Sequence, residues 1–147
     1  MATIQLPPDF REFLKLLNSS NVEYLVIGGY AVNYYGFPRA TADLDIWIAI
    51  NPDNAQRITQ ALRSFGFPQA DANPFQKERQ IIRMGVPPMR LEILTTISGA
   101  DFTDCYARRL EADLDGVLVN FIQLDDLKRN KQASGRLKDR VDLEQLP

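Results

Sequence analysis

The sequence contains no histidine, and cysteine occurs once, as Cys105. Without histidine, the chain can build neither a Ser-His-Asp nor a Cys-His catalytic arrangement, and histidine-ligated zinc is excluded. A single cysteine can form neither an intrachain disulfide nor a cysteine-rich zinc site. Any chemistry of this chain is therefore expected to depend on carboxylates.

Long apolar runs and a large net charge are also lacking. No stretch approaches the ~20 apolar residues that cross a bilayer, and the first ten residues, MATIQLPPDF, show no basic start followed by an apolar run. We therefore expect a cytoplasmic protein with no membrane partner. The formal net charge of -2 argues against extensive wrapping of nucleic acid, although a local basic patch could still bind phosphates.

The composition is ordinary for a folded protein. Hydrophobic residues make up 45% of the 147 residues and charged residues 24%. A chain of this length suits one domain with one modest core, so we expect a single domain over residues 1–147.

Hydrophobic periodicity predicts alternating helices and strands. The expected elements are a helix after Pro7-Pro8, a buried strand over 24–27, a short helix over 31–36, a strand over 43–50, a helix over 52–65, strands over 80–84 and 90–94 joined as a hairpin through 85–88, a strand over 117–122, and two C-terminal helices separated near Gly135. This order predicts an α/β (α+β) fold in which a single mixed sheet has helices mainly on one face, plus the C-terminal helices.

Two acidic side chains share one face of the strand over 43–50. Because side chains alternate along a strand, Asp43 and Asp45 lie on the face opposite Leu44 and Ile46, roughly 6.5–7 Å apart at Cα. Their carboxylates can converge on one hard cation such as Mg²⁺. Taken alone, such a pair is more often a solvated strand face, so the neighbouring residues must decide between the two interpretations.

Two further features favour the metal site. Glu92 projects from its predicted strand on the face opposite Leu91 and Ile93, and an adjacent strand would bring it to the aspartates. Gly28-Gly29 stands between a strand and a helix, where it allows a ligand to approach the backbone and aims free N–H groups at an anion. A triphosphate is the natural anion for such a site.

With these residues in place, the stretch GGYAVNYYGFPRATADLDIWI resembles the nucleotidyltransferase superfamily of DNA polymerase β type, especially minimal nucleotidyltransferases and abortive-infection nucleotidyltransferase toxins. The resemblance is strongest over residues 22–50. It extends to RLEIL around Glu92 and to the C-terminal segment LDDLKRNKQASGRLKDRVDLEQL. It implies the nucleotidyltransferase fold.

The resemblance also implies roles for individual residues. Asp43, Asp45 and Glu92 would be catalytic and would bind Mg²⁺ (or Mn²⁺), while Gly28 and Gly29 would contact the phosphates of a nucleoside triphosphate such as ATP. Lys131 and Arg136, in a cluster of basic residues beside Gly135, are further candidates for phosphate binding. Salt bridges to Asp139 or Asp142 explain these two basic residues equally well.

The implied function is metal-dependent transfer of a nucleoside monophosphate to a hydroxyl of a protein or RNA acceptor, in a toxin-antitoxin system with a cognate toxin or antitoxin partner. Two alternatives remain open. Many superfamily members have Gly-Ser where this chain has Gly-Gly, so the chain could be an inactive binding module that keeps the fold, acting as an antitoxin or regulatory partner. A phosphohydrolase using the same acidic strand is the third possibility.

Overall fold

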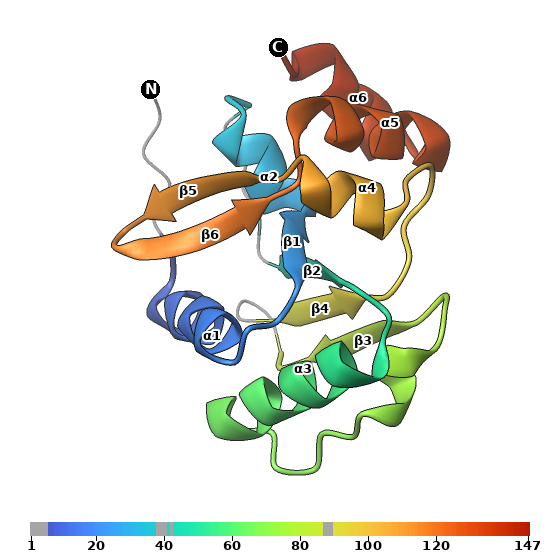
Figure 1. Ribbon diagram of the computed structural model, residues 1–147. Helices are drawn as coiled ribbons and strands as arrows, with labels where there is room; N and C mark the ends of the chain where they lie inside the picture. The colour runs from blue at the N-terminus through green and yellow to red at the C-terminus, as the bar shows by residue number, and fades with distance from the viewer. Residues whose placement is uncertain (1–5, 38–40, 42, 87–89) are drawn as a thin grey trace.

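The computed structural model describes residues 6–37, 41, 43–86 and 90–147. The helices are α1 (Pro8–Ser19), α2 (Gly28–Tyr34), α3 (Pro52–Phe65), α4 (Phe102–Ala107), α5 (Leu124–Ser134) and α6 (Leu137–Gln145), with a 3-10 turn at Asn73–Gln76. The strands are β1 (Tyr24–Ile27), β2 (Leu44–Ile48), β3 (Ile81–Met84), β4 (Leu91–Leu94), β5 (Leu110–Leu114) and β6 (Val117–Phe121). Figure 1 shows their arrangement.

The strands form one six-stranded mixed sheet in the order β3-β4-β2-β1-β6-β5. The two central strands, β1 and β2, are antiparallel, and each has a parallel neighbour on its outer side, β6 and β4 respectively. The edges are the antiparallel hairpins β3–β4 and β5–β6. The single mixed sheet and the β3–β4 hairpin are as predicted; residues 87–88 of its expected turn lie outside the described part of the chain.

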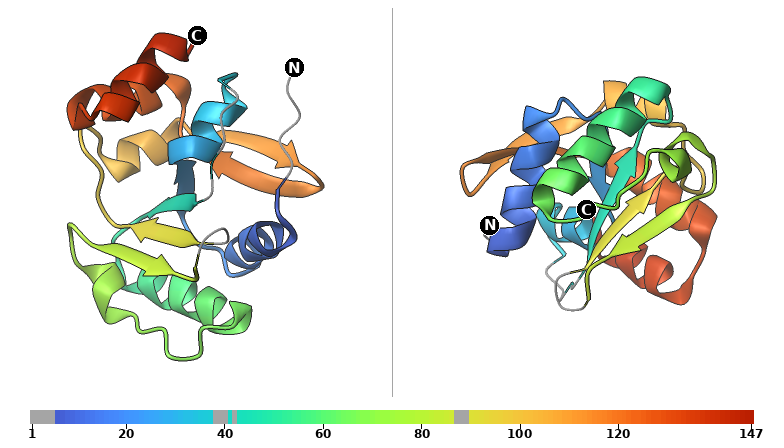
Figure 2. Two further views of the ribbon diagram at one scale, coloured as in Figure 1. Left: turned by 180° about the vertical axis from the view of Figure 1, so that it is seen from behind. Right: turned by 90° about the horizontal axis from the view of Figure 1, so that it is seen from below.

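Helices α1 and α3 lie side by side against one face of the sheet, while α4, α5 and α6 lie on the other side (Figure 1 and Figure 2). The rings of Phe13 in α1 and Phe65 in α3 are 5.1 Å apart at their centroids. Leu44, Ile46 and Ile48 of β2 are completely buried, as expected for a strand face that two helices cover. This packed layer fixes β2 and, with it, the direction of the acidic side chains on the opposite face.

Helix α3 is positioned by its first residues. Asn51 Oδ1 accepts a hydrogen bond from the Asn54 backbone N–H at 2.8 Å, and Pro52 occupies the first helical position, which is a favourable N-terminus. The buried Asn54 amide then bonds the backbone of Glu23 and the carbonyl of Ala49. Asn54 therefore connects α3 to the start of β1 and the end of β2.

Some boundaries differ from the sequence prediction. Strand β2 ends at Ile48 rather than Ile50, and Ile50 is 36% exposed. Helix α2 begins directly at Gly28 instead of residue 31. The sequence patterns also missed α4 and β5, because α4 is only six residues long and β5 carries two acidic residues, which are uncommon in strands. Among the described residues, no helix is both long and apolar enough to cross a membrane.

Candidate active site

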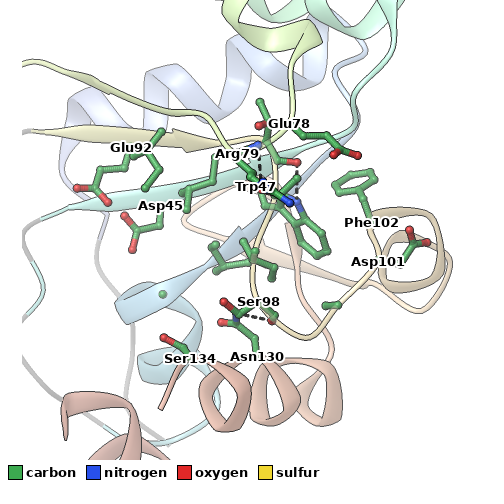
Figure 3. Close-up of a pocket in the computed structure, with 18 of the residues that line it drawn as sticks. Asp45, Trp47, Glu78, Arg79, Glu92, Ser98, Asp101, Phe102, Asn130 and Ser134 are labelled. Carbon is green, nitrogen blue, oxygen red and sulfur yellow. Dashed lines mark hydrogen bonds between the residues drawn. The ribbon is translucent and has the colours of Figure 1, made fainter. Parts of the chain in front are cut away.

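Strand pairing places the two acidic segments beside each other. Strand β2 runs parallel to β4 with Asp45 opposite Glu92, and antiparallel to β1 with Asp45 opposite Ile27. Because paired residues of adjacent strands project to the same face, Asp45 and Glu92 point into the same space (Figure 3). The sequence prediction expected this proximity only if the strands were adjacent, and they are.

The environment of Asp45 disfavours its ionised form. Burial raises the pKa of the Asp45 carboxyl to about 7, and the charge of Glu92, a hydrogen bond with Glu92 and the charge of Asp43 act in the same direction. Lys138 opposes them by lowering the pKa. In addition, Asp45 Oδ1 is buried and has no hydrogen-bond partner within the described residues. A cation at this oxygen would supply the missing partner.

Two arginines contact the other two carboxylates. Arg90 Nη2 lies 2.7 Å from Asp43 Oδ2 and 3.6 Å from Glu92 Oε1, and Arg83 Nε lies 2.9 Å from the same Glu92 oxygen. Within the described part of the chain, no three acidic side chains are arranged as a ready metal site. The side chains of Asp43 and Glu92 are instead held in ion pairs, and Asp45 is the acid without an arginine partner in the described residues.

Gly28 lies directly against the Asp45 carboxylate. Its φ angle is +67°, in the left-handed region that favours glycine, and a Cβ atom at this position would lie 2.0 Å from Asp45 Oδ2. Only glycine therefore permits both this backbone turn and this position of Asp45. Gly29 is buried in the first turn of α2.

A cavity of about 880 Å³ lies between the sheet and the helices α4, α5 and α6. Asp45 and Glu92 line one part of it, while Trp47 and Phe102 line another (Figure 3). Gly28 lines the cavity beside Asp45. On the helical side, Asn130 and Ser134 belong to α5. The volume is within the range of small-molecule sites and suits a nucleotide.

The two basic residues singled out from the sequence are both in ion pairs. Lys131 Nζ lies 3.2 Å from Asp139 Oδ1 and 3.1 Å from Asp142 Oδ2, and its side chain is only 4% exposed. Arg136 Nε lies 2.8 Å from Asp139 Oδ2, although 61% of its side chain remains exposed. Arg136 and Lys131 line the cavity. The hydrogen bond to Asp139 raises the pKa of Arg136, and the charges of Asp139, Asp45 and Glu92 add to this effect.

Lys138 is a third basic residue of the cavity, which the sequence did not distinguish from its neighbours. It is exposed on the first turn of α6, and its positive charge lowers the pKa of Asp45. Within the described residues it forms no ion pair, in contrast to Lys131 and Arg136. The cluster of basic residues indicated this region, but only the path of the chain around Gly135 determines which members face the carboxylates.

Burial alone would raise the pKa of Asp139, which joins α5 and α6. Hydrogen bonds from Arg136 and Ser134 and the charge of Lys131 outweigh burial and hold this pKa well below its usual value. Asp139 therefore remains charged and keeps both basic residues in place on the helical wall of the cavity.

No protein-family model matches the chain, and no curated protein matches it in sequence. The solved structures that resemble it in fold include two crystal structures. A candidate nucleotidyltransferase from Thermotoga maritima is 16% identical, with a TM-score of 0.64 over 95% of this chain and 93% of the other. An antigenic nucleotidyltransferase-like protein from Paracoccidioides brasiliensis is 19% identical, with a TM-score of 0.55 over 95% of this chain and 74% of the other. The chain therefore has the nucleotidyltransferase fold.

Proposed function

We propose that this protein is a metal-dependent nucleotidyltransferase that transfers a nucleoside monophosphate from a nucleoside triphosphate to a hydroxyl of a protein or RNA. One observation carries the proposal: Asp45 and Glu92 are paired across parallel strands, and a buried oxygen of Asp45 lacks a partner in the described residues. They line a cavity of nucleotide size on a nucleotidyltransferase fold.

The residues of the site fit a divalent cation in their chemistry. Asp43, Asp45 and Glu92 provide only oxygen ligands, which Mg²⁺ and Mn²⁺ prefer. The raised pKa of Asp45 means that its ionised form is destabilised, and a bound cation would stabilise that form. When bound, the metal would make the acceptor hydroxyl more acidic and neutralise charge on the phosphates.

The protein's own groups would position the reactants. Lys138 and the exposed Arg136 place positive charge beside the carboxylates, where a triphosphate would extend along the helical wall. Glu92 would accept the proton of the acceptor hydroxyl, whose oxygen then forms a bond to the α-phosphorus. The bond from this phosphorus to the bridging oxygen breaks, and pyrophosphate leaves.

The acceptor and the biological setting are part of the proposal. Within a toxin-antitoxin system, a partner protein would either select the acceptor or be the acceptor itself. The site requires only a hydroxyl that reaches the α-phosphorus beside Glu92, and ATP is the first donor to test.

An experiment with labelled nucleotide tests the proposed transfer. Purified protein is incubated with each α-labelled nucleoside triphosphate, Mg²⁺, and candidate protein or RNA acceptors. We expect label on an acceptor from the α position and none from the γ position. Asp45→Asn should abolish the signal, whereas Asp53→Asn, on an exposed turn of α3, should retain it.

The same experiment distinguishes the alternatives. Labelled free nucleotide without a labelled acceptor would indicate a phosphohydrolase. Binding of nucleotide without any reaction would indicate a binding module that keeps the fold. The ion pairs of Arg90 and Arg83 with the acids are the observation that favours the binding module.

A further inference from the structure

Arg90 is held opposite Asp43 by the backbone. Its carbonyl oxygen accepts a hydrogen bond from the Leu44 N–H at 3.1 Å, one step before the paired residues Leu44 and Leu91. Strand pairing therefore fixes the start of the Arg90 side chain beside the acids. A flexible side chain at this position still has freedom to turn away from them.

The guanidinium of Arg90 bridges two of the three acids. The same nitrogen, Nη2, lies 2.7 Å from Asp43 Oδ2 and 3.6 Å from Glu92 Oε1. The side chains of Asp43 and Glu92 are only 25% and 17% exposed, so these charges are partly shielded from water. A positive charge between two such carboxylates relieves their repulsion.

Within the described part of the chain, few polar contacts other than those to the acids hold the guanidinium of Arg90. Its Nε atom is buried without a hydrogen-bond partner in the described residues, and Asp43 is the only group to which its side chain donates within them. An arginine has five N–H donors, and this guanidinium uses one of them for a hydrogen bond within the described residues. Among the described residues, moving the Arg90 side chain away would therefore break no side-chain hydrogen bond or ion pair besides those to Asp43 and Glu92.

We propose that Arg90 is an exchangeable counter-ion, which neutralises Asp43 and Glu92 when no metal is bound and turns away when a divalent cation takes its place. The inference rests on the proposed metal-dependent function. Arg90 is thus a positioning residue: it holds the acids together in the metal-free protein and competes with the metal for them.

Binding of Mn²⁺ alone, without nucleotide, tests the exchange by calorimetry at low ionic strength. Arg90→Gln should bind Mn²⁺ about tenfold more tightly than the unchanged protein, because the metal no longer displaces a cation. In the absence of metal the same variant should melt at a lower temperature, since Asp43 and Glu92 then repel each other.

Arg79→Gln is the matched control. Arg79 also lines the cavity but forms no ion pair within the described residues, so this variant measures the effect of removing one nearby positive charge. It should change Mn²⁺ affinity about twofold or less. Equal gains in Arg79→Gln and Arg90→Gln would overturn the exchange, as would an Arg90→Gln variant that binds Mn²⁺ no more tightly than the unchanged protein.

A second measurement uses the unchanged protein and does not depend on how the variant folds. The Nε–Hε signal of Arg90, assigned with Arg90→Lys, should shift in ¹H–¹⁵N spectra as Mg²⁺ is added, and Asp45→Asn should abolish this shift. A signal that stays fixed while Mg²⁺ binds would refute the exchange but leave the proposed transferase intact. If Mg²⁺ and Mn²⁺ both fail to bind even to Arg90→Gln, the exchange and the metal-dependent function fail together.

Discussion

At the scale of single residues, the charge of Asp45 links the candidate site to the stability of the protein. The folded pKa of about 7 lies above 3.8, the ordinary value of an aspartate carboxyl. A group of this kind contributes stability below its unfolded pKa, and this contribution is lost as the pH rises through the folded pKa. In the metal-free protein, ionisation of Asp45 therefore lowers the free energy of unfolding.

We predict that Asp45→Asn removes this loss of stability, because asparagine does not ionise. In EDTA, the free energy of unfolding of the variant should increase relative to that of the unchanged protein between pH 5 and pH 8, by on the order of 2 kcal/mol. Urea unfolding at several pH values measures the difference. The exposed Asp53→Asn provides the baseline. A difference that does not vary with pH would contradict the prediction, because it would mean that folding does not change the pKa of Asp45.

Gly28 leads to a second prediction at this scale. Gly28→Ala combines an unfavourable φ with a Cβ atom 2.0 Å from Asp45 Oδ2, whereas Gly135→Ala has almost the same φ, +66°, and its nearest neighbour is 3.9 Å away. We expect a loss of about 1–2 kcal/mol for Gly135→Ala and on the order of 3 kcal/mol for Gly28→Ala. Denaturant titration compares the two, and equal losses would mean that Asp45 moves aside freely.

The shared face of the acidic residues could be predicted from the sequence, because alternation along a strand assigns side chains to faces. Asp43, Asp45 and Glu92 each alternate with buried aliphatic residues, and the pairing of Asp45 with Glu92 then followed once β2 and β4 proved to be neighbours. The importance of Arg90 and Lys138 could not be predicted in this way. Their roles depend on distances between segments that the pattern within one segment does not contain.

At the scale of elements, the ion cluster between α5 and α6 is the main polar contact on the helical side of the cavity. Lys131, Asp139 and Asp142 are all at least 96% buried. Burying such charges is unfavourable unless each is paired, so the cluster is tolerated only while it is complete. It fixes the angle at which α6 leaves Gly135, and with it the position of Lys138.

Lys131→Met should therefore destabilise the protein by about 3–5 kcal/mol, because the buried carboxylates of Asp139 and Asp142 lose the positive charge that they share. The exposed Lys15→Met in α1 should change stability by less than about 0.5 kcal/mol. Thermal unfolding compares them. Phosphate binding by Lys131 remains a prediction. It is tested by measuring the nucleotide affinity of Lys131→Met under conditions in which the variant is folded. A large loss of affinity with little loss of stability would favour this role.

Element boundaries were predicted well where local signals are strong. Asn51, Pro52 and Gly66 determine the ends of α3, and Gly135, with φ of +66°, ends α5 as expected. In contrast, β5 has no such signals: it is an edge strand with half-exposed and acidic residues, and its pairing with β6 decides its conformation. Tertiary contact outweighs the intrinsic preference of these residues.

At the scale of the whole molecule, the cavity lies between two layers, the sheet and the C-terminal helices. The sheet provides Asp45 and Glu92, and the C-terminal helices provide Arg136 and Lys138. A triphosphate bound across the cavity would contact both layers at once. Ligand binding would therefore stabilise the molecule as a whole and not one layer alone.

We predict that a non-hydrolysable nucleoside triphosphate with Mg²⁺ raises the melting temperature more than Mg²⁺ alone. At a ligand concentration of 100 times the Kd, the gain in stability is about 2.7 kcal/mol. Differential scanning calorimetry measures it. Lys138→Gln should reduce the rise in melting temperature that nucleotide causes but retain the rise that Mg²⁺ causes. If the response to nucleotide is unchanged, Lys138 does not bind phosphate.

The parallel pairing of β2 with β4 has a consequence for how the protein folds. Asp43 and Arg90 are 47 residues apart in the chain, so their contact closes a long loop, whereas the β3–β4 and β5–β6 hairpins form between neighbouring segments. Closing long loops is slow because of its entropy cost. During synthesis and refolding, the chain should thus form hairpins and helices first, and Asp45 and Glu92 should come together only when β2 pairs with β4.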